Sequence, residues 1–291
     1  MKLKDWTAFI LLGLAWGSSF LWIKIAVREI GPFTLVALRL LFGILGLAAV
    51  MAYNKPKWPD RRRLWLAMLV LGLTNTAIPF VLISWGELHI DSAVAAVLNS
   101  TVPLFTMIIA HLFLSDDRLT LPRLIGLLTG FGGVVVLLLR DLDLASGLSN
   151  SNAIGQGAVL LAALFYASSG VFARRNTQGL SPVVQALVPL VVADSAIWLA
   201  APVAESPFTL PKLPLTWLAI LWLGLVGSCF AYLLYYYLIH SVGPTRTTLV
   251  TYVFPLVGVA LGVIFLNELL DWHLLVGGSM VVGSIAVVNL R

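Results

Sequence analysis

The sequence predicts an all-α membrane protein with ten transmembrane helices, arranged as two inverted five-helix repeats, with the N- and C-termini in the cytoplasm. Three observations lead to this fold class: the composition, the spacing of apolar runs and an internal repeat. Of the 291 residues, 60% are hydrophobic and only 11% are charged, whereas soluble domains average about 45–50% apolar and about 25% charged residues. A soluble fold could not cover its surface with so few charges. Cytosolic enzymes, nucleic-acid-binding proteins and disordered proteins are therefore excluded.

Ten apolar runs are long enough to cross a bilayer, for which a helix needs about 20 residues. Prolines, glycines and charged clusters separate these runs. Lys2 and Lys4 precede the first run, as basic residues precede a signal peptide, but this run is too long and lacks a small-residue cleavage site, so we expect a retained helix. The expected spans are 6–27, 32–53, 64–86, 91–114, 121–139, 153–174, 181–201, 214–239, 244–266 and 272–290.

The basic residues indicate the orientation of these spans. Thirteen of the eighteen Lys and Arg fall on the side that both termini share, four fall on the other side, and Arg39 lies inside the second span. Because basic residues are enriched in cytoplasmic loops, both termini are expected in the cytoplasm of an inner-membrane protein. The cluster KPKWPDRRR at 55–63 is expected to anchor this topology, with binding of anionic lipid as the alternative.

The chain also repeats itself. WLAMLVLGL at 65–73 matches WLAILWLGL at 217–225 in seven of nine residues, and the same offset of 152 places Pro103 on Pro255. Earlier in each half the offset is 150, which places Trp16 on Tyr166. The halves are 1–145 and 146–291, and because each holds five spans, an odd number, the second enters the membrane inverted. Inverted repeats place a binding site near the midplane between the halves and permit alternating access, which predicts a secondary transporter.

Several motifs resemble those of the drug/metabolite transporter superfamily, EamA type. AWGSSFLWIKIA at 15–26 resembles the opening helix of that family, and Arg39 resembles its second-helix arginine. The set Pro103, Asp116 and Gly126 resembles the family's fourth and fifth helices, and Pro255, Glu268 and Gly278 repeat it. The chain departs from the pattern at Tyr166-Ala167, where Trp-Gly is usual, and at Asp116, where glutamate is usual. The resemblance covers the whole chain and implies export of small metabolites, with YddG-like exporters of amino acids, aromatic ones included, as the most similar type.

Two charged residues are expected deep in the membrane. Arg39 lies seven residues into the second span, and Asp194 lies at a similar depth in the seventh. Such residues usually pair with each other or mark a pathway. The two either form a buried ion pair with each other or with other neighbours, or act as a partner of a substrate carboxylate or as a proton-coupling site, which makes them candidate gating or coupling residues. Lys24 is expected to snorkel at the outer boundary, and Glu87 is expected to be solvated near a span end.

Polar and aromatic residues at repeat-related positions are the candidates for substrate contact, with helix packing as the alternative for the serines. Pro103 and Pro255 should free backbone carbonyls in the fourth and ninth spans, so they are candidate gating positions, and the polar residues before them should line a cavity. Tyr232 and Tyr236 share a helix face, whereas Tyr235 should point elsewhere. The candidate substrate-binding residues are Trp16, Ser18, Ser19, Asn75, Trp85, Asn99, Thr101, Tyr166, Ser168, Tyr232, Tyr236, Thr251 and Tyr252.

Other functions find little support in the sequence. The GxSxG, HExxH and P-loop patterns are absent, so we expect neither an enzyme nor a cofactor, and the histidines lack metal-ligand spacing. The partners expected are the lipid bilayer and a small molecule, not nucleic acid. A channel, a flippase or an uptake facilitator of the same fold for another metabolite or drug is the alternative. Proton antiport and facilitated diffusion remain open, and a monomer suffices because ten spans enclose a site.

Overall fold

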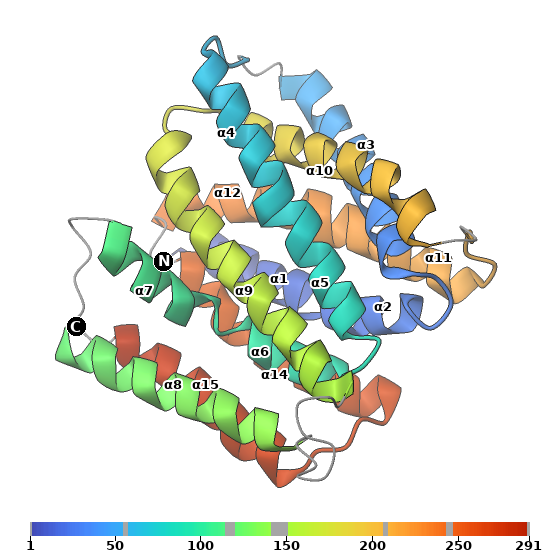
Figure 1. The fold of residues 1–291 in the computed structure, drawn as a ribbon. Coiled ribbons are helices and arrows are strands. Elements are labelled where there is room, and N and C mark those ends of the chain that lie inside the picture. The colour runs from blue at the N-terminus through green and yellow to red at the C-terminus, as the bar shows by residue number, and fades with distance from the viewer. Residues whose placement is uncertain are drawn as a thin grey trace.

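The computed structural model describes residues 2–54, 58–113, 120–140, 151–205, 209–242 and 247–289, and every regular element within them is a helix. Figure 1 shows these helices packed into one bundle. The α-helices are α1 (Leu3–Gly17), α2 (Ser19–Ala26), α3 (Pro32–Asn54), α4 (Arg62–Gly72), α5 (Ile78–Gly86), α6 (Ser92–Asn99), α7 (Val102–Phe113), α8 (Leu121–Arg140), α9 (Ser151–Asn176), α10 (Pro182–Ala204), α11 (Pro214–Leu221), α12 (Ala231–Val242), α14 (Val253–Leu266) and α15 (Trp272–Asn289). Three further helical segments are η1 (Leu73–Ala77) and η3 (Trp222–Phe230), which are π-helical, and η4 (Thr248–Tyr252), which is a 3₁₀-helix.

Eight helical segments in the described residues are long and apolar enough to cross a membrane. A shorter apolar helix, Val250–Leu266, follows the eighth, and α15 closes the chain with 18 residues. The eight segments are Leu3–Ala26, Pro32–Tyr53, Arg62–Gly86, Ser92–Phe113, Arg123–Arg140, Ser151–Asn176, Val183–Ala204 and Pro214–Tyr235.

Several of these segments are interrupted near their middle. The segment Ser92–Phe113 breaks between α6 and α7, directly before Pro103, which cannot donate a backbone hydrogen bond. Ser100 and Thr101 turn their hydroxyl groups onto the carbonyl oxygens three residues earlier, each at 2.6 Å. In the other half, η4 lies directly before Pro255. The two prolines therefore interrupt the helices as the sequence predicts, and the Ser100 and Thr101 hydroxyl groups bond carbonyls in the last turn of α6.

Helices from the two halves of the chain pair with one another. The main packing pairs are α3 with α10, α5 with α9, α6 with α14, α8 with α15 and α1 with α12. Figure 1 shows α8 and α15 side by side along the lower edge. A Cβ built on Gly133 would lie 2.6 Å from the Gly277 carbonyl oxygen, so these glycines allow close approach of the two helices. The halves thus interleave instead of forming two separate bundles.

One side-chain contact recurs in both halves at the start of the third helix of each. Trp65 donates its indole N–H to the carbonyl of Pro59 at 3.0 Å. Trp217 donates to the carbonyl of Pro211 at 3.0 Å. The offset between the two contacts is 152 residues for both partners, which equals the offset of the sequence repeat.

Candidate functional site

Arg39 is a buried cation in the middle of α3, with 6% of its surface exposed. Its Nε donates to the Oγ of Ser228 in η3 at 3.2 Å. The guanidinium carbon lies 4.0 Å from the centroid of the Phe80 ring, a cation–π arrangement. Ser228 is the one hydrogen-bond partner that the described residues give to this guanidinium, although an arginine has five N–H donors. Most of its donors are therefore available to an anionic ligand.

Aromatic side chains from three helices gather beside this arginine. The Trp16 indole of α1 donates to the carbonyl oxygen of Gly227 at 3.0 Å. Its ring centroid lies 6.1 Å from that of Tyr232, 5.5 Å from that of Tyr235 and 5.9 Å from that of Phe254. A Cβ on Gly227 would lie 3.7 Å from the Nη2 of Arg39. Gly227 and Ser228, neighbours in η3, therefore connect the aromatic cluster to Arg39.

The second half contributes Tyr166 of α9 to the same region. Tyr166 packs against both main groups of buried apolar side chains. Tyr166, Tyr232 and Glu87 are the ionisable neighbours of Arg39. The structure therefore brings together Trp16, Arg39, Tyr166 and Tyr232, four of the residues that the sequence predicts, which we call the Arg39 site.

The serines of the first span lie beside this site, but their hydroxyl groups are largely engaged. Ser18 and Ser19 each donate to the carbonyl of Ala15 at 3.1 Å. The Trp222 indole donates to the Ser18 hydroxyl at 3.1 Å. A Cβ on Gly227 would lie 3.3 Å from the Oγ of Ser19, so Ser19 lies close to the point where Arg39 meets η3.

The repeat-related serines of α9 differ from this arrangement. Ser168 is exposed and donates to its own helix, to the carbonyl of Leu164, at 2.8 Å. Its neighbour Ser169 is buried and donates to the Thr74 hydroxyl at 2.8 Å. Ser168 and Ser169 therefore point in different directions, because the 100° step between helix residues carries Ser169 inward and leaves Ser168 exposed.

Further candidates lie in η1 and at the ends of α5 and α6. Asn75 is half-buried in η1. Asn99 is buried at the end of α6, and its Oδ1 has no hydrogen-bond partner among the described residues. Trp85 packs edge-on against His89, with ring centroids 4.6 Å apart. None of these contacts joins the three residues to the Arg39 site.

The residues before the two prolines have different surroundings. Thr101 is fully buried and its hydroxyl bonds the backbone, as described above. Thr251 and Tyr252 are half-buried in η4. The side chain of Tyr236 lies outside the described residues, as does Asp116. Tyr235 packs against Trp16, so the expectation that it points elsewhere is wrong: residues three apart also share a helix face.

Asp194 is not brought to Arg39. It is half-buried on α10 beside the exposed Val191 and Ser195, and its side chain interacts with Trp198. Among the described residues no ion pair joins Asp194 to Arg39. The sequence indicates a similar depth for the two residues along their helices, but it does not determine the side of the helix on which each side chain lies.

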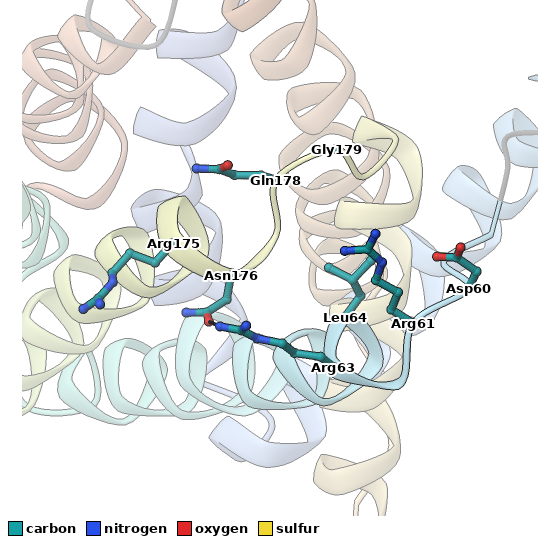
Figure 2. Close-up of a pocket in the computed structure, with 8 residues that line it drawn as sticks. All are labelled: Asp60, Arg61, Arg63, Leu64, Arg175, Asn176, Gln178 and Gly179. Carbon is teal, nitrogen blue, oxygen red and sulfur yellow. Dashed lines mark hydrogen bonds between the residues drawn. The ribbon is translucent and has the colours of Figure 1, made fainter.

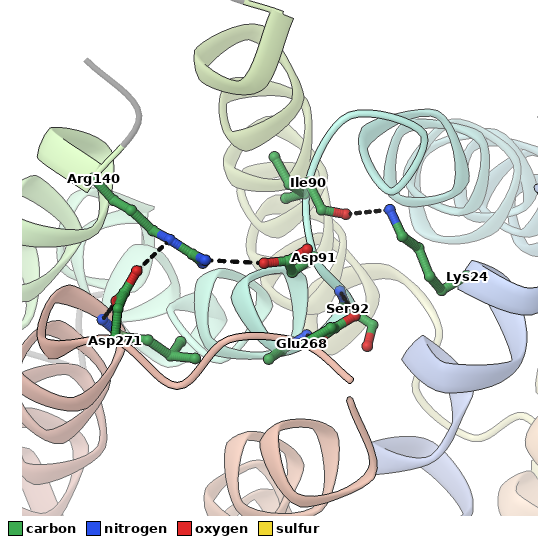
Figure 3. Close-up of polar contacts among 9 residues, drawn as sticks. Lys24, Ile90, Asp91, Ser92, Arg140, Glu268 and Asp271 are labelled. Atoms are coloured by element: carbon green, nitrogen blue, oxygen red, sulfur yellow. Dashed lines mark hydrogen bonds and ion pairs between the residues drawn. The ribbon is translucent and has the colours of Figure 1, made fainter. Parts of the chain in front are cut away.

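Glu87 is the buried carboxylate that the sequence did not indicate. It directly follows α5, is fully buried, and neither carboxylate oxygen has a hydrogen-bond partner among the described residues. The Lys24 ammonium donates to the backbone carbonyl of Glu87 at 2.6 Å. It also donates to that of Ile90 at 2.8 Å (Figure 3). The expectation that Glu87 is solvated is therefore wrong, and the half-buried Lys24 directs its ammonium to carbonyls of the 87–91 connection. A charge one residue beyond an apolar run resembles a span boundary, so the sequence gives no sign that tertiary packing buries this residue.

Ion pairs tie the halves together at the end of the bundle that carries 27–31, 87–91, 209–213 and 267–271, which we call the opposite end. Arg140 bonds Asp91 at 3.0 Å and Asp271 at 2.6 Å, as Figure 3 shows. Arg140 and Asp91 belong to the first half and Asp271 to the second. The arginine therefore bridges the halves through two carboxylates.

Three glutamates strengthen the same end by binding backbone N–H groups of the other half. Glu268 accepts from Ser92 and its neighbour at the start of α6, at 2.8 and 2.9 Å. Glu205 accepts from Phe33 and its neighbour at the start of α3, at 2.6 and 3.0 Å. Glu29 accepts from the N–H groups of 212 and 213 just before α11, at 2.6 and 3.0 Å. Each carboxylate satisfies unpaired donors at a helix N-terminus, where negative charge is favoured.

At the other end, which carries the N-terminus, a cavity of about 390 Å³ opens between the start of α4 and the end of α9 (Figure 2). Arg63 donates to the Oδ1 of Asn176 at 3.2 Å across it. The cavity is lined by Asp60, Arg61, Arg63, Leu64, Arg175, Asn176, Gln178 and Gly179. It is a basic mouth and shares no residue with the Arg39 site.

In the part of the chain that the structure describes, no three His, Cys, Asp or Glu residues lie close enough together to bind a metal ion. The single cysteine, Cys229, is buried.

Comparison with known proteins adds the family. The profile of the EamA-like transporter family matches residues 6–139 and again residues 153–290. The chain belongs to the EamA-like transporter family. An uncharacterized transporter of Archaeoglobus fulgidus is 26% identical over 98% of this chain and 99% of its own length. The uncharacterized inner membrane transporter YedA of Escherichia coli K12 is 30% identical over 88% of this chain and 80% of its own.

A further relative, named a probable terminal-alkyne amino-acid exporter, from Streptantibioticus cattleyicolor, is 25% identical over 100% of this chain and 95% of its own length. A solved crystal structure superposes with a TM-score of 0.71 at 19% identity, covering 99% of this chain and 98% of that chain, which shows a shared fold. This EamA-like protein is thus a multi-pass inner-membrane transporter, which acts on a small molecule within a lipid bilayer.

Proposed function

We propose that this transporter exports amino acids, aromatic ones included, and related small metabolites from the cytoplasm by alternating access. The observation that carries the proposal is the buried guanidinium of Arg39, which has one hydrogen-bond partner among the described residues and stands beside aromatic rings. A guanidinium binds a carboxylate through two parallel hydrogen bonds. Aromatic rings around it suit an apolar or aromatic side chain.

The proposed architecture is ten spans in two inverted repeats, 1–145 and 146–291, with both termini cytoplasmic. Three features support it: the family profile matches twice, helices pair between the halves, and the Trp65 and Trp217 contacts recur at one offset. In this topology the basic mouth faces the cytoplasm and the opposite end faces outward. The proposed substrate contacts are the Arg39 site with Ser18, Ser19, Asn75, Asn99, Thr101, Thr251 and Tyr252.

Counterflow of labelled amino acids in proteoliposomes tests the proposal. We expect uptake of label to be stimulated by unlabelled amino acid inside the vesicle, because alternating access returns a loaded site faster than an empty one. A channel shows no such stimulation, and a flippase moves lipid instead. Absence of counterflow for every amino acid would refute amino-acid transport.

Arg39→Gln tests the role of the arginine through substrate discrimination. The wild type should prefer an amino acid over its carboxamide by about 100-fold or more, since two charged hydrogen bonds contribute about 1.5–3 kcal/mol each. Arg39→Gln should lose this preference, and Arg39→Lys should keep part of it. Arg28→Gln, an exposed arginine at the opposite end, is the matched control and should keep the preference. Equal discrimination by wild type and Arg39→Gln would remove Arg39 from the carboxylate site.

A further inference from the structure

Glu87 is a buried acid without a partner, close to the proposed substrate site. Its carboxyl is fully buried and neither oxygen accepts a hydrogen bond from a described residue. The neighbouring cation, Lys24, donates two hydrogen bonds to backbone carbonyls and none to the Glu87 carboxyl. An ionised carboxylate in such a place is costly, so the group takes up a proton and becomes neutral.

The groups that face Glu87 come from every element packed around it. They are Lys24 from α2, Arg39 from α3 and Glu268 from the 267–271 connection, and their charges act on its carboxyl. His89 and Asp91 share its own connection, but His89 packs on Trp85 and Asp91 pairs with Arg140. On α9 the buried Gln156 near this end carries no charge. Burial raises the pKa of Glu87 well above its usual range, while Lys24 and Arg39 oppose the rise and Glu268 adds to it.

The chemistry of an amino acid gives this acid a role. If the substrate carboxylate binds Arg39, its ammonium group enters the same buried region and needs an anionic partner, because an unpaired buried charge is strongly unfavourable. Glu87 is the carboxylate whose charge acts on Arg39. Tyr166 and Tyr232, the other ionisable neighbours of Arg39, are neutral phenols near pH 7.

We propose that Glu87 is a shared site at which the substrate ammonium group and a proton compete. This inference rests on the proposed export of amino acids. In the empty protein the carboxyl holds a proton; when a zwitterion binds, the carboxyl releases that proton to water and the resulting carboxylate pairs with the ammonium group. One proton leaves for each substrate bound, so no oxidant or other reactant is needed.

Competition for one carboxylate couples the two flows. A site that holds either a proton or a zwitterion, and that faces one side at a time, exchanges one proton for one substrate molecule in each cycle. Because the zwitterion has no net charge, each export cycle carries one positive charge inward. Amino-acid export is then driven by both the pH difference and the membrane potential.

The test measures proton release by purified protein in a weakly buffered solution with a pH-sensitive dye, after addition of each neutral L-amino acid at matched pH. The amino acid that gives the largest counterflow should release about one proton per molecule bound, and its N-acetyl derivative, which lacks the ammonium group, should release none. Its affinity should fall as the pH is lowered, by at most about tenfold per pH unit. A carboxylic-acid infrared band should disappear on binding.

Glu87→Gln should abolish proton release, the infrared change and the pH dependence of affinity. Glu87→Asp keeps a titratable group and should restore all three with a shifted pH midpoint, which covers the case in which Glu87→Gln does not fold. Glu29→Gln is the same chemical change at a half-buried position of the same end and should release protons as the wild type does.

Three results would overturn the inference. One is counterflow by the wild type without proton release, which leaves amino-acid transport standing and removes proton coupling. Another is proton release that persists in Glu87→Gln. The third is loss of release in Asp194→Asn but not in Glu87→Gln, which would assign coupling to the carboxylate that the sequence predicts. Absence of counterflow refutes the proposed function itself, and the inference falls with it.

Discussion

Glu268 should control how readily the opposite end opens. Its carboxylate accepts hydrogen bonds at 2.8 and 2.9 Å from the first N–H groups of α6. Glu268→Gln keeps the shape but removes the negative charge and one acceptor. A hydrogen bond to a charged group contributes about 1.5–3 kcal/mol and a neutral one about 0.5–1.5, and the charge at the helix N-terminus adds about 0.3–1. Since Glu268 is half-exposed, solvent screens part of this stabilisation. We therefore expect Glu268→Gln to destabilise the closed form of the opposite end by about 1–2 kcal/mol.

A loss of that size raises the open population by about 5- to 30-fold. The assay is maleimide labelling of Ser92→Cys in a Cys229→Ala background, since Ser92 is fully buried beneath Glu268. When closing is faster than labelling, the labelling rate follows the open population. Glu268→Gln should accelerate labelling by this factor, and Asp60→Asn at the other end should not. An unchanged rate in Glu268→Gln would refute a latching role for Glu268.

Two further predictions concern stability. Gly133→Ala should destabilise the folded protein by about 1–3 kcal/mol, because the added Cβ meets the backbone of α15. The Cβ of Gly157→Ala meets no atom within 4 Å, so this variant should stabilise α9 by about 0.5–1 kcal/mol. Thermal unfolding in detergent should show a lower melting temperature for Gly133→Ala and a higher one for Gly157→Ala. The Thr216 hydroxyl, followed by two backbone N–H groups, lowers the pKa of Glu29, so Glu29 contributes stability at neutral pH that is lost as the pH falls through the lowered pKa. Wild type and Glu29→Gln should therefore differ in melting temperature near pH 7 and converge once the pH falls below the lowered pKa of Glu29, and a constant difference would contradict this pH dependence.

The sequence predicts the helices well because their signals are local. Apolar runs bounded by prolines and charges correspond to helices in the structure, and Pro103 and Pro255 interrupt theirs as expected. The π-helical turns η1 and η3 were not predicted, because a one-residue insertion leaves no mark in an apolar run. Trp16 and Tyr166, which the repeat relates to each other, lie in one region with Arg39 and Tyr232.

The errors arise where the rotation of a helix or the packing of a loop decides the outcome. Ser168 and Ser169 are neighbours in sequence, yet only Ser169 is buried, and an average over a span does not distinguish them. Asp194 has the depth of Arg39 but a different direction around its helix. Glu87 directly follows α5, which packs against α9 about seventy residues further along the chain, so nothing local marks it as an interior acid.

The π-helical segments η1 and η3 have a mechanical consequence. Residues 73–77 shifted by the repeat offset of 152 fall inside η3, so each half has a surplus residue at the same place in its third helix. A π-turn can move along a helix by exchanging one set of carbonyl partners for the next, which rotates the side chains it passes while the two helix ends stay anchored. In η3 those side chains include Ser228, which holds Arg39. In the proposed transport cycle, substrate contact at Arg39 and the register of η3 would be mechanically linked, so that a bound molecule that pulls on Arg39 would also turn the helix that carries Ser228.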